Sequence, residues 1–143
     1  MAAVARIQEL LGGEAVTGPL RTEQDVLGLV RRGVPTEAVE RFLRRSQLGF
    51  TVIEANVVPR RTFKRREAEA KPLGPVESDR LVRLVRLVAA AEETFGDPEK
   101  ARRWLERPSR PLDGEAPLSL ADTDGGARRV EALLGQIAHG LAA

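Results

Sequence analysis

The fold of this 143-residue chain is decided by the stretch Phe50-Thr-Val-Ile-Glu-Ala-Asn-Val-Val-Pro-Arg-Arg-Thr-Phe-Lys-Arg-Arg-Glu-Ala68. Gly49 separates this stretch from what precedes it, and residues 50 to 56 form one short segment. Val57 and Val58 then lead into Pro59, where a second short helix begins and runs to about residue 68. Two short helices joined by a tight turn are typical of a helix-turn-helix.

The second of these helices combines one apolar residue with a dense group of cations. Residues 60 to 66 hold five cations in seven positions, and Phe63 is the residue that would anchor the helix from behind. Lys and Arg neutralise DNA phosphates, an Arg side chain can bind O6 and N7 of guanine together, and a Thr can bond a phosphate or touch a thymine methyl. The alternative is a solvated basic helix face. We predict DNA contacts by Arg60, Arg61, Thr62, Lys64, Arg65 and Arg66.

Two helices are predicted before this stretch. Residues 22 to 32 place Val26, Leu29 and Val30 on one face and end at Gly33. Pro35 can begin the next helix because the N–H that it lacks is not needed in a first turn, and this helix runs to about residue 46. Further upstream, apolar residues at helical spacing predict a short helix that ends at Gly12-Gly13, and a loop follows over residues 14 to 20.

A longer helix is predicted from Val76 to Thr94. Its apolar stripe consists of Leu81, Leu84, Val85, Val88, Ala91 and Phe95. The cations Arg80, Arg83 and Arg86 fall on the opposite face. We interpret these three arginines as a solvated face, and the alternative is that they extend the positive surface.

The C-terminal third contains shorter helical pieces. Asp97-Pro98 predicts the start of a helix that carries Trp104 in the core and stops before Pro108. Pro and Gly residues interrupt the stretch from 109 to 117, and Asp122 or Thr123 caps a last helix. Because such an interrupted segment does not form a core by itself, it must dock on the Trp104 helix or on a partner.

The composition favours an all-α fold and argues against catalysis. Aromatic residues make up 3% of the chain, whereas Leu, Ala, Val and Arg dominate. The chain has no Cys and one His, so neither a thiolate metal site nor a nucleophile with a base and an orienting group can be assembled. We therefore predict no enzyme activity, no metal and no cofactor.

Charge and hydropathy indicate where the protein acts. Residues 1 to 96 carry 16 basic and 13 acidic groups, and residues 97 to 143 carry 7 and 8, so the N-terminal part is the expected nucleic-acid side. No apolar run approaches the roughly 20 residues of a membrane span, and the N-terminus lacks the features of a signal peptide. We expect a cytoplasmic protein.

Two sets of motifs, one in each half of the chain, form a pattern together. The upstream set is Pro59-Arg-Arg-Thr62, Arg65-Arg66 and Glu77-Ser78 through Leu84. The downstream set is Phe95-Gly-Asp-Pro-Glu-Lys-Ala101, Trp104-Leu105, Pro108, Leu112, Gly114, Pro117-Leu118, Thr123, Gly126-Ala127, Arg129-Val130, Leu133-Leu134, Ile137 and Gly140. The first set resembles the Xre-like helix-turn-helix and the helix after it, and the second resembles the toxin-binding domain, of the Xre/MbcA/ParS-type antitoxins. Residues 1 to 20 have no counterpart.

The resemblance implies a type II toxin-antitoxin role. Such an antitoxin dimerises, represses its operon, and blocks a RES-domain toxin that consumes NAD, its C-terminal domain covering the entrance to the toxin's active site. We expect a DNA-binding and dimerisation region over residues 1–95 and a toxin-binding domain over residues 96–143. The alternative is a stand-alone transcription regulator whose C-terminal part only dimerises. The predicted toxin contacts are His139, Gly140, Leu141, Ala142 and Ala143.

Overall fold

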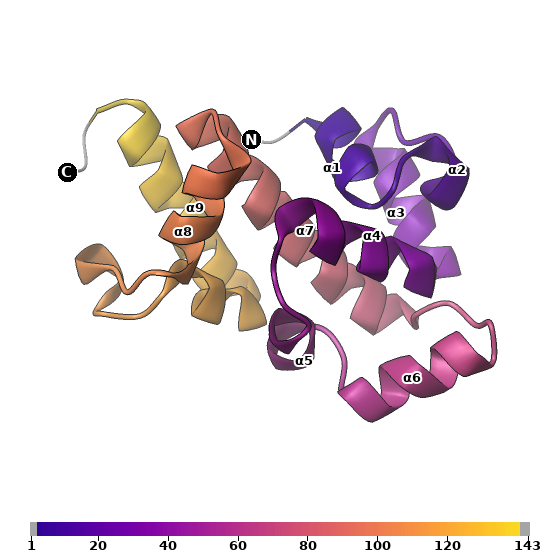
Figure 1. The fold of residues 1–143 in the computed structure, drawn as a ribbon. Coiled ribbons are helices and arrows are strands. Elements are labelled where there is room, and N and C mark those ends of the chain that lie inside the picture. The colour runs from indigo at the N-terminus through magenta and orange to yellow at the C-terminus, as the bar shows by residue number, and fades with distance from the viewer. Residues whose placement is uncertain (1–2, 141–143) are drawn as a thin grey trace.

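The computed structural model describes residues 3–140, and within that range it consists of helices and turns without a β-strand. The predicted all-α fold is therefore confirmed (Figure 1). The elements are α1 (Val4–Leu10), α2 (Glu14–Thr17), α3 (Glu23–Arg32), α4 (Thr36–Ser46), α5 (Thr51–Asn56), α6 (Arg60–Ala68), α7 (Pro75–Phe95), α8 (Pro98–Glu106), the 3-10 helices η1 (Arg110–Leu112) and η2 (Pro117–Asp122), and α9 (Asp124–Ala138).

The long helix α7 is the centre of the molecule. In Figure 1 it crosses the fold diagonally, with α1 to α4 on one side, α8 and α9 on the other, and α5 and α6 below it. The predicted apolar stripe is buried from Leu81 to Ala91, but Val82, Leu87 and Ala89 are buried as well. A helix that is apolar on nearly all sides is a core helix. Both halves of the chain thus share one helix and one core.

The interpretation of the α7 arginines as a solvated face is wrong for two of the three. Arg80 is exposed, but Arg83 and Arg86 are half-buried. Arg83 Nε donates to the carbonyl oxygen of Ala121, 3.3 Å away, and Arg86 pairs with Glu23 of α3. The reason is tertiary: α3 and α9 both pack against α7, so this face is covered.

The N-terminal segment differs from its prediction in one respect. The predicted first helix is present as α1, and Ile7, Leu10 and Leu11 are fully buried. The predicted loop after it, however, contains the four-residue helix α2. A helix of one turn has too few residues to show a periodic pattern, so α2 could not be predicted from hydrophobic periodicity.

The junction between α3 and α4 fixes the start of α7. The backbone N–H of Val34 donates to Ser78 Oγ at 2.8 Å, and Leu73 N–H donates to the carbonyl oxygen of Val34 at 2.9 Å. Gly33 has a φ of 95°, and a Cβ at this position would collide with the Leu73 carbonyl oxygen. Only glycine fits here without a shift of the backbone.

The C-terminal pieces dock on the rest of the chain. The Asp97 carboxylate caps α8 by accepting from Lys100 N–H at 3.0 Å, and Thr123, rather than Asp122, caps α9. The ring of Trp104 packs against that of Phe95, with centroids 5.4 Å apart, so Trp104 lies at the edge of the core and is partly buried. The interrupted stretch forms η1 and η2, which bury Leu112, Leu118 and Ala121 against their neighbours.

Two classes of feature are not found in residues 3–140. None of the helices there combines the length and the apolar character that crossing a bilayer needs. No group of three or more His, Asp or Glu side chains is gathered in this range as a metal site would require.

Candidate functional site

The predicted helix-turn-helix is present as α5 and α6, and a short buried turn joins the two helices. The N–H groups of Val57 and Val58 both donate to the carbonyl oxygen of Ile53, at 2.8 and 3.0 Å. Both valine side chains are buried. The turn is therefore held by backbone hydrogen bonds and by the core, which fixes the direction in which α6 leaves it.

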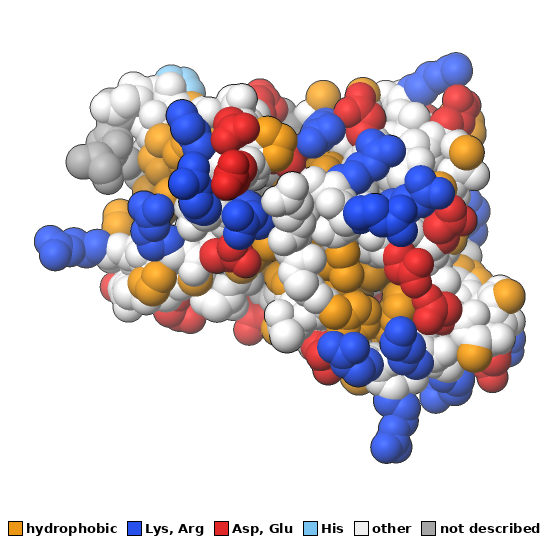
Figure 2. Space-filling view, in the orientation of Figure 1, with side chains coloured by type: hydrophobic (Ala, Val, Ile, Leu, Met, Phe, Trp, Pro, Cys, Tyr) orange, Lys and Arg blue, Asp and Glu red, His pale blue; other side chains and the backbone are white. Residues whose placement is uncertain are grey.

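Helix α6 is anchored by a single aromatic residue. Phe63 is 1% exposed, and its ring centroid lies 5.1 Å from that of Phe50. The predicted anchor is confirmed. Because Phe63 faces the core, all cations of the helix except Arg66 are exposed. Figure 2 shows basic side chains gathered at the lower edge of the molecule, over α6.

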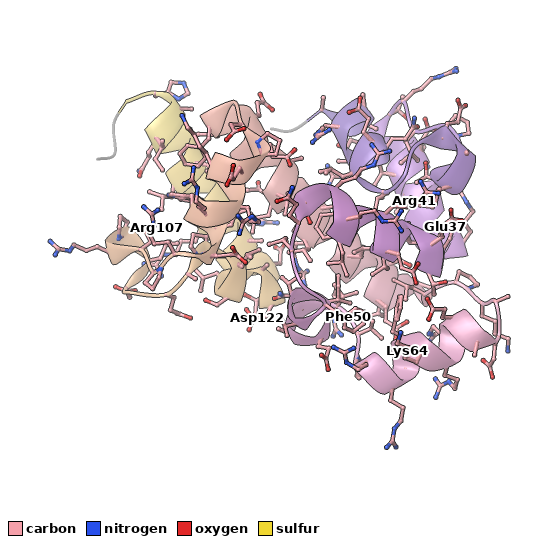
Figure 3. The ribbon with its side chains drawn as sticks, in the orientation of Figure 1. Glu37, Arg41, Phe50, Lys64, Arg107 and Asp122 are labelled. Atoms are coloured by element: carbon pink, nitrogen blue, oxygen red, sulfur yellow. The ribbon has the colours of Figure 1, made fainter. Side chains whose placement is uncertain are left out.

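The cations of α6 differ in what holds them. The Arg60 guanidinium lies 3.0 Å from Glu54 Oε1 and 4.5 Å above the Phe50 ring centroid. Lys64, labelled beside α6 in Figure 3, lies 3.6 Å from Glu67 on the next turn. Both side chains are exposed, and each is paired with a nearby carboxylate.

Arg66 is turned inward. Its Nε lies 3.1 Å from Glu77 Oε1, and its Nη1 donates to the carbonyl oxygen of Pro72 at 3.2 Å. Glu77 also accepts from Gly74 N–H at 2.8 Å. Arg66 therefore braces the connection between α6 and α7, and its side chain is half-buried.

Arg61 and Arg65 are the cations of α6 that point away from the protein. Both are exposed, and within the part of the chain that the structure describes neither forms an ion pair. They are four residues apart and so lie on one face of the helix, next to the half-exposed Thr62. This face has the charge and the freedom that contact with a phosphate backbone or a base edge requires.

Two carboxylates lie beside this basic helix. Glu67 of α6 raises the pKa of Glu40 on α4, chiefly because the two side chains share a hydrogen bond that needs a proton. Burial and the charge of Glu67 act in the same direction, whereas Lys64 and Arg44 oppose them. A carboxyl with a raised pKa therefore lies where α4 and α6 approach each other.

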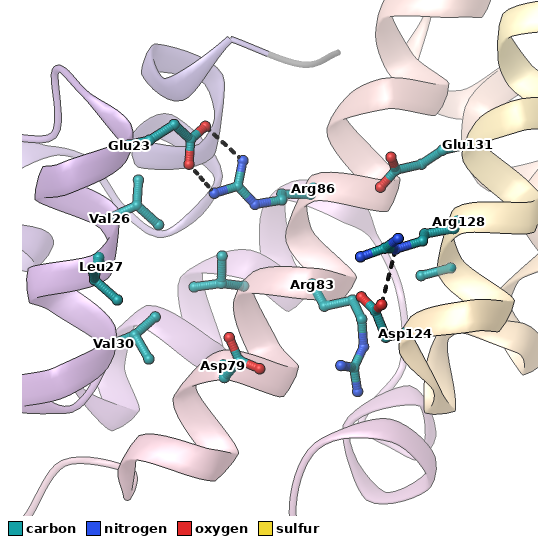
Figure 4. Close-up of a pocket in the computed structure, with 12 residues that line it drawn as sticks. Glu23, Val26, Leu27, Val30, Asp79, Arg83, Arg86, Asp124, Arg128 and Glu131 are labelled. Carbon is teal, nitrogen blue, oxygen red and sulfur yellow. Dashed lines mark hydrogen bonds and ion pairs between the residues drawn. The ribbon is translucent and has the colours of Figure 1, made fainter.

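A second feature lies where the two halves of the chain meet. A cavity of about 310 Å³ is bounded by α3, α7 and α9, and Leu27, Asp79 and Arg83 are among its lining residues (Figure 4). Arg86 and Glu23 form an ion pair across it, and the hydrogen bond from Arg86 holds the pKa of Glu23 below its usual value. Sequence reasoning did not find this pair, because residues 63 positions apart carry no local signal.

The predicted toxin contacts lie at the end of α9. His139 and Gly140 are exposed, and His139 Nδ1 lies 2.8 Å from the Gly135 carbonyl oxygen. Leu141, Ala142 and Ala143 lie outside the described residues. In Figure 1 helix α9, which these residues follow, ends at the top left, whereas α6 lies at the lower right.

Two regions of the chain match families of known proteins. Residues 25–86 match the family described as the antitoxin Xre-like helix-turn-helix domain. Residues 90–140 match the family described as the antitoxin Xre/MbcA/ParS C-terminal toxin-binding domain. The matches meet within α7, and α1 and α2 precede both. The predicted boundary at residue 95 stays a prediction.

The chain is also similar to three curated proteins, each named Antitoxin Xre. It is 42% identical to the one from Pseudomonas putida over 84 residues, which are 59% of this chain and 53% of the relative. The protein from Yersinia enterocolitica is 36% identical over 63% of this chain and 62% of the relative. The protein from Photorhabdus laumondii is 32% identical over 79% and 78%. The chain therefore spans about half of the first relative and more of the others.

Proposed function

This chain belongs to the Xre/MbcA/ParS family of antitoxins, and we propose that it serves a type II toxin-antitoxin system by binding a cognate toxin and its own operator DNA. Members of this family are binding proteins rather than enzymes. The mechanism is therefore occupancy: one surface covers DNA and another covers a toxin. The observation that carries the proposal is the separation of two surfaces along α7: the exposed cations of α6 lie near its start, where Arg66 pairs with Glu77, and the toxin-binding match covers its last turns, α8 and α9.

On the DNA side, α6 enters the major groove and Arg61, Arg65 and Thr62 face the bases or phosphates. Arg60 and Lys64 bind the phosphate backbone, exchanging the carboxylates of Glu54 and Glu67 for phosphate oxygens. Arg66 contributes by holding the start of α7 and, where its pair with Glu77 opens, by contact with phosphate. Two copies bind as a homodimer, because paired recognition helices reach successive major grooves about one helical turn apart. Operator binding by the dimer represses its own operon.

On the toxin side, the partner is a RES-domain enzyme that degrades NAD, and the C-terminal domain covers the entrance to its active site. His139 and Gly140, with Leu141, Ala142 and Ala143 after them, reach the toxin. The exposure of His139 and Gly140 at the end of α9 supports this assignment, since a partner can reach them there. No catalytic step on this chain is involved.

Co-expression with the gene product encoded beside this chain tests the proposal. Cells that express the neighbouring gene alone should stop growing and lose NAD, and expression of this chain should restore both growth and the NAD pool. A gel-shift titration with the DNA upstream of the operon tests the second activity. A neighbouring product that is not toxic, together with operator binding by this chain, would instead identify a stand-alone regulator.

A further inference from the structure

A groove of about 1010 Å³ runs between the C-terminal half of α7 and helix α9. At one end it is continuous with the cavity of Figure 4, because the two share Glu23, Arg86, Arg128 and Glu131. At its other end it reaches His139. All of its lining residues except Glu23 and Arg86 fall within the toxin-binding match at residues 90–140.

Small side chains on the walls of the groove leave room for another helix to approach closely. Its lining includes Ala90, Ala132, Gly135 and Ala138, whose side chains are small. Two helices pack about 8–10 Å apart, and small residues at the contact permit the shorter distance. An amphipathic helix that lays its apolar face into a groove between helices is a common mode of protein recognition.

The groove also carries a net negative charge. Two arginines and three glutamates line it, and both arginines are already paired, Arg86 with Glu23 and Arg128 with Asp124. Glu93 on α7 and Glu131 on α9 form no ion pair with any residue from 3 to 140. Glu93 and Glu131 therefore leave negative charge on both helices that line the groove, and cations on an occupant would complement that charge.

We propose that this groove receives an amphipathic helix of the cognate toxin, with small or aliphatic side chains against Ala132 and Gly135 and Lys or Arg side chains opposite Glu93 and Glu131. The proposal rests on the proposed antitoxin function and adds the surface and the chemistry of the partner. His139 lines one end of this groove and would contact the bound helix there. A toxin held in the groove would lie beside the end of α9, within reach of the residues that follow Gly140.

A second copy of this chain fits less well as the occupant of the groove. Two copies related by a two-fold axis would place the same negative patch against itself, which is unfavourable.

Gly135 offers a substitution that blocks the groove without disturbing the fold. It is exposed on α9, and a Cβ at this position meets nothing within 4 Å. Replacing a helical glycine also removes a helix penalty of about 1 kcal/mol. Gly135→Trp should fill the groove with an indole ring. Gly125→Trp is the matched control, because Gly125 also lies in α9 in open space but does not line the groove.

The test is a titration of the full chain and each variant against the cognate toxin inactivated at its active site. We expect Gly135→Trp to raise the Kd about tenfold or more, as blocking a buried hot spot does, and Gly125→Trp to leave it within about twofold. Equal affinities for the two variants would overturn the groove assignment while leaving the antitoxin function intact. Failure of the wild-type chain to bind the toxin would refute the proposed function, and this proposal with it.

Two further measurements separate the occupants. Glu93→Lys combined with Glu131→Lys should weaken toxin binding, and Glu99→Lys combined with Glu115→Lys, at exposed sites away from the groove, should not. Sedimentation of the free Gly135→Trp variant should give the same mass as the wild-type chain. A smaller mass would identify the groove as a contact between two copies and would overturn the proposal.

Discussion

Arg6 of α1 binds the buried carboxylate of Glu92 on α7 with two nitrogens, Nε at 2.8 Å and Nη2 at 2.6 Å from the same Oε1. Glu92 is 8% exposed and lies where the toxin-binding match begins, whereas α1 precedes both matched regions. The N-terminal helix is thus part of the core and is joined by charge to the C-terminal half of α7.

Removing this pair should destabilise the protein. Arg6→Ala leaves the Glu92 carboxylate buried without its partner, and an unsatisfied buried group costs about 1–3 kcal/mol, the lower part of the range applying because Arg6 is itself 35% exposed. Urea unfolding of the variant measures the loss, and Arg21→Ala, at an exposed arginine outside any ion pair among the described residues, is the control. Equal midpoints for the two variants would show that the contact contributes nothing to stability.

The outward cations of α6 should control operator binding. Arg61→Ala combined with Arg65→Ala removes two phosphate or base contacts, so affinity should fall and the slope of log K against log salt should flatten by about 2. A gel-shift titration at several salt concentrations measures both quantities. Arg103→Ala combined with Arg107→Ala removes the same charge from exposed positions at α8 and should have little effect. If both double variants bind alike, α6 is not the recognition helix.

The pair of Glu40 and Glu67 should make stability depend on pH. The pKa of Glu40 is raised in the folded state, so the folded protein holds the proton more tightly than the unfolded chain. Its stabilising contribution is present below the ordinary glutamate pKa and is lost as pH rises through the raised value. Glu40→Gln keeps a hydrogen-bond donor to Glu67 at every pH. The variant should therefore be more stable than the wild-type chain near neutral pH.

Denaturation at a series of pH values checks this expectation. The advantage of Glu40→Gln should shrink as the pH falls to about 4, where the wild-type carboxyl is itself protonated. Glu99→Gln, at an exposed glutamate of α8 without an ion pair among residues 3 to 140, is the control and should follow the wild-type curve. An advantage that stays constant with pH would point to a cause other than the shared proton.

Much of this fold could be predicted because helix starts and apolar spacing are set by residues close together in the sequence. Pro59, the apolar Phe63 and the cations around it identified α6, and Asp97-Pro98 located the start of α8. The distribution of exposure along α7 was not predictable in this way. The sequence pattern places Arg86 on the same polar face of α7 as the exposed Arg80. Arg86 is half-buried and pairs with Glu23 because α3 and α9 pack against α7 beside it.

The candidate site was predicted unevenly for the same reason. A run of cations indicates a DNA-binding helix, but the sequence does not show which of these cations form ion pairs within the protein. Arg66 pairs with Glu77, eleven residues away, whereas Arg65 beside it does not pair within the described residues. The α7–α9 groove was missed altogether, because small residues such as Ala132 and Gly135 carry no signal until another helix lies beside them.

The chain end should separate toxin binding from toxin neutralisation. Removing residues 139–143 leaves α9 complete to Ala138, and the core residues Val130, Leu133 and Leu134 stay in place, so the fold and operator binding should be retained. If the groove holds the toxin and the chain end covers its active site, the truncated chain should still bind the toxin but fail to rescue growth. A titration and a growth-rescue assay on the same variant measure the two effects. Rescue at the wild-type level would show that His139, Gly140 and the three residues after them are not needed to inhibit the toxin. Inhibition would then come from binding at the groove alone.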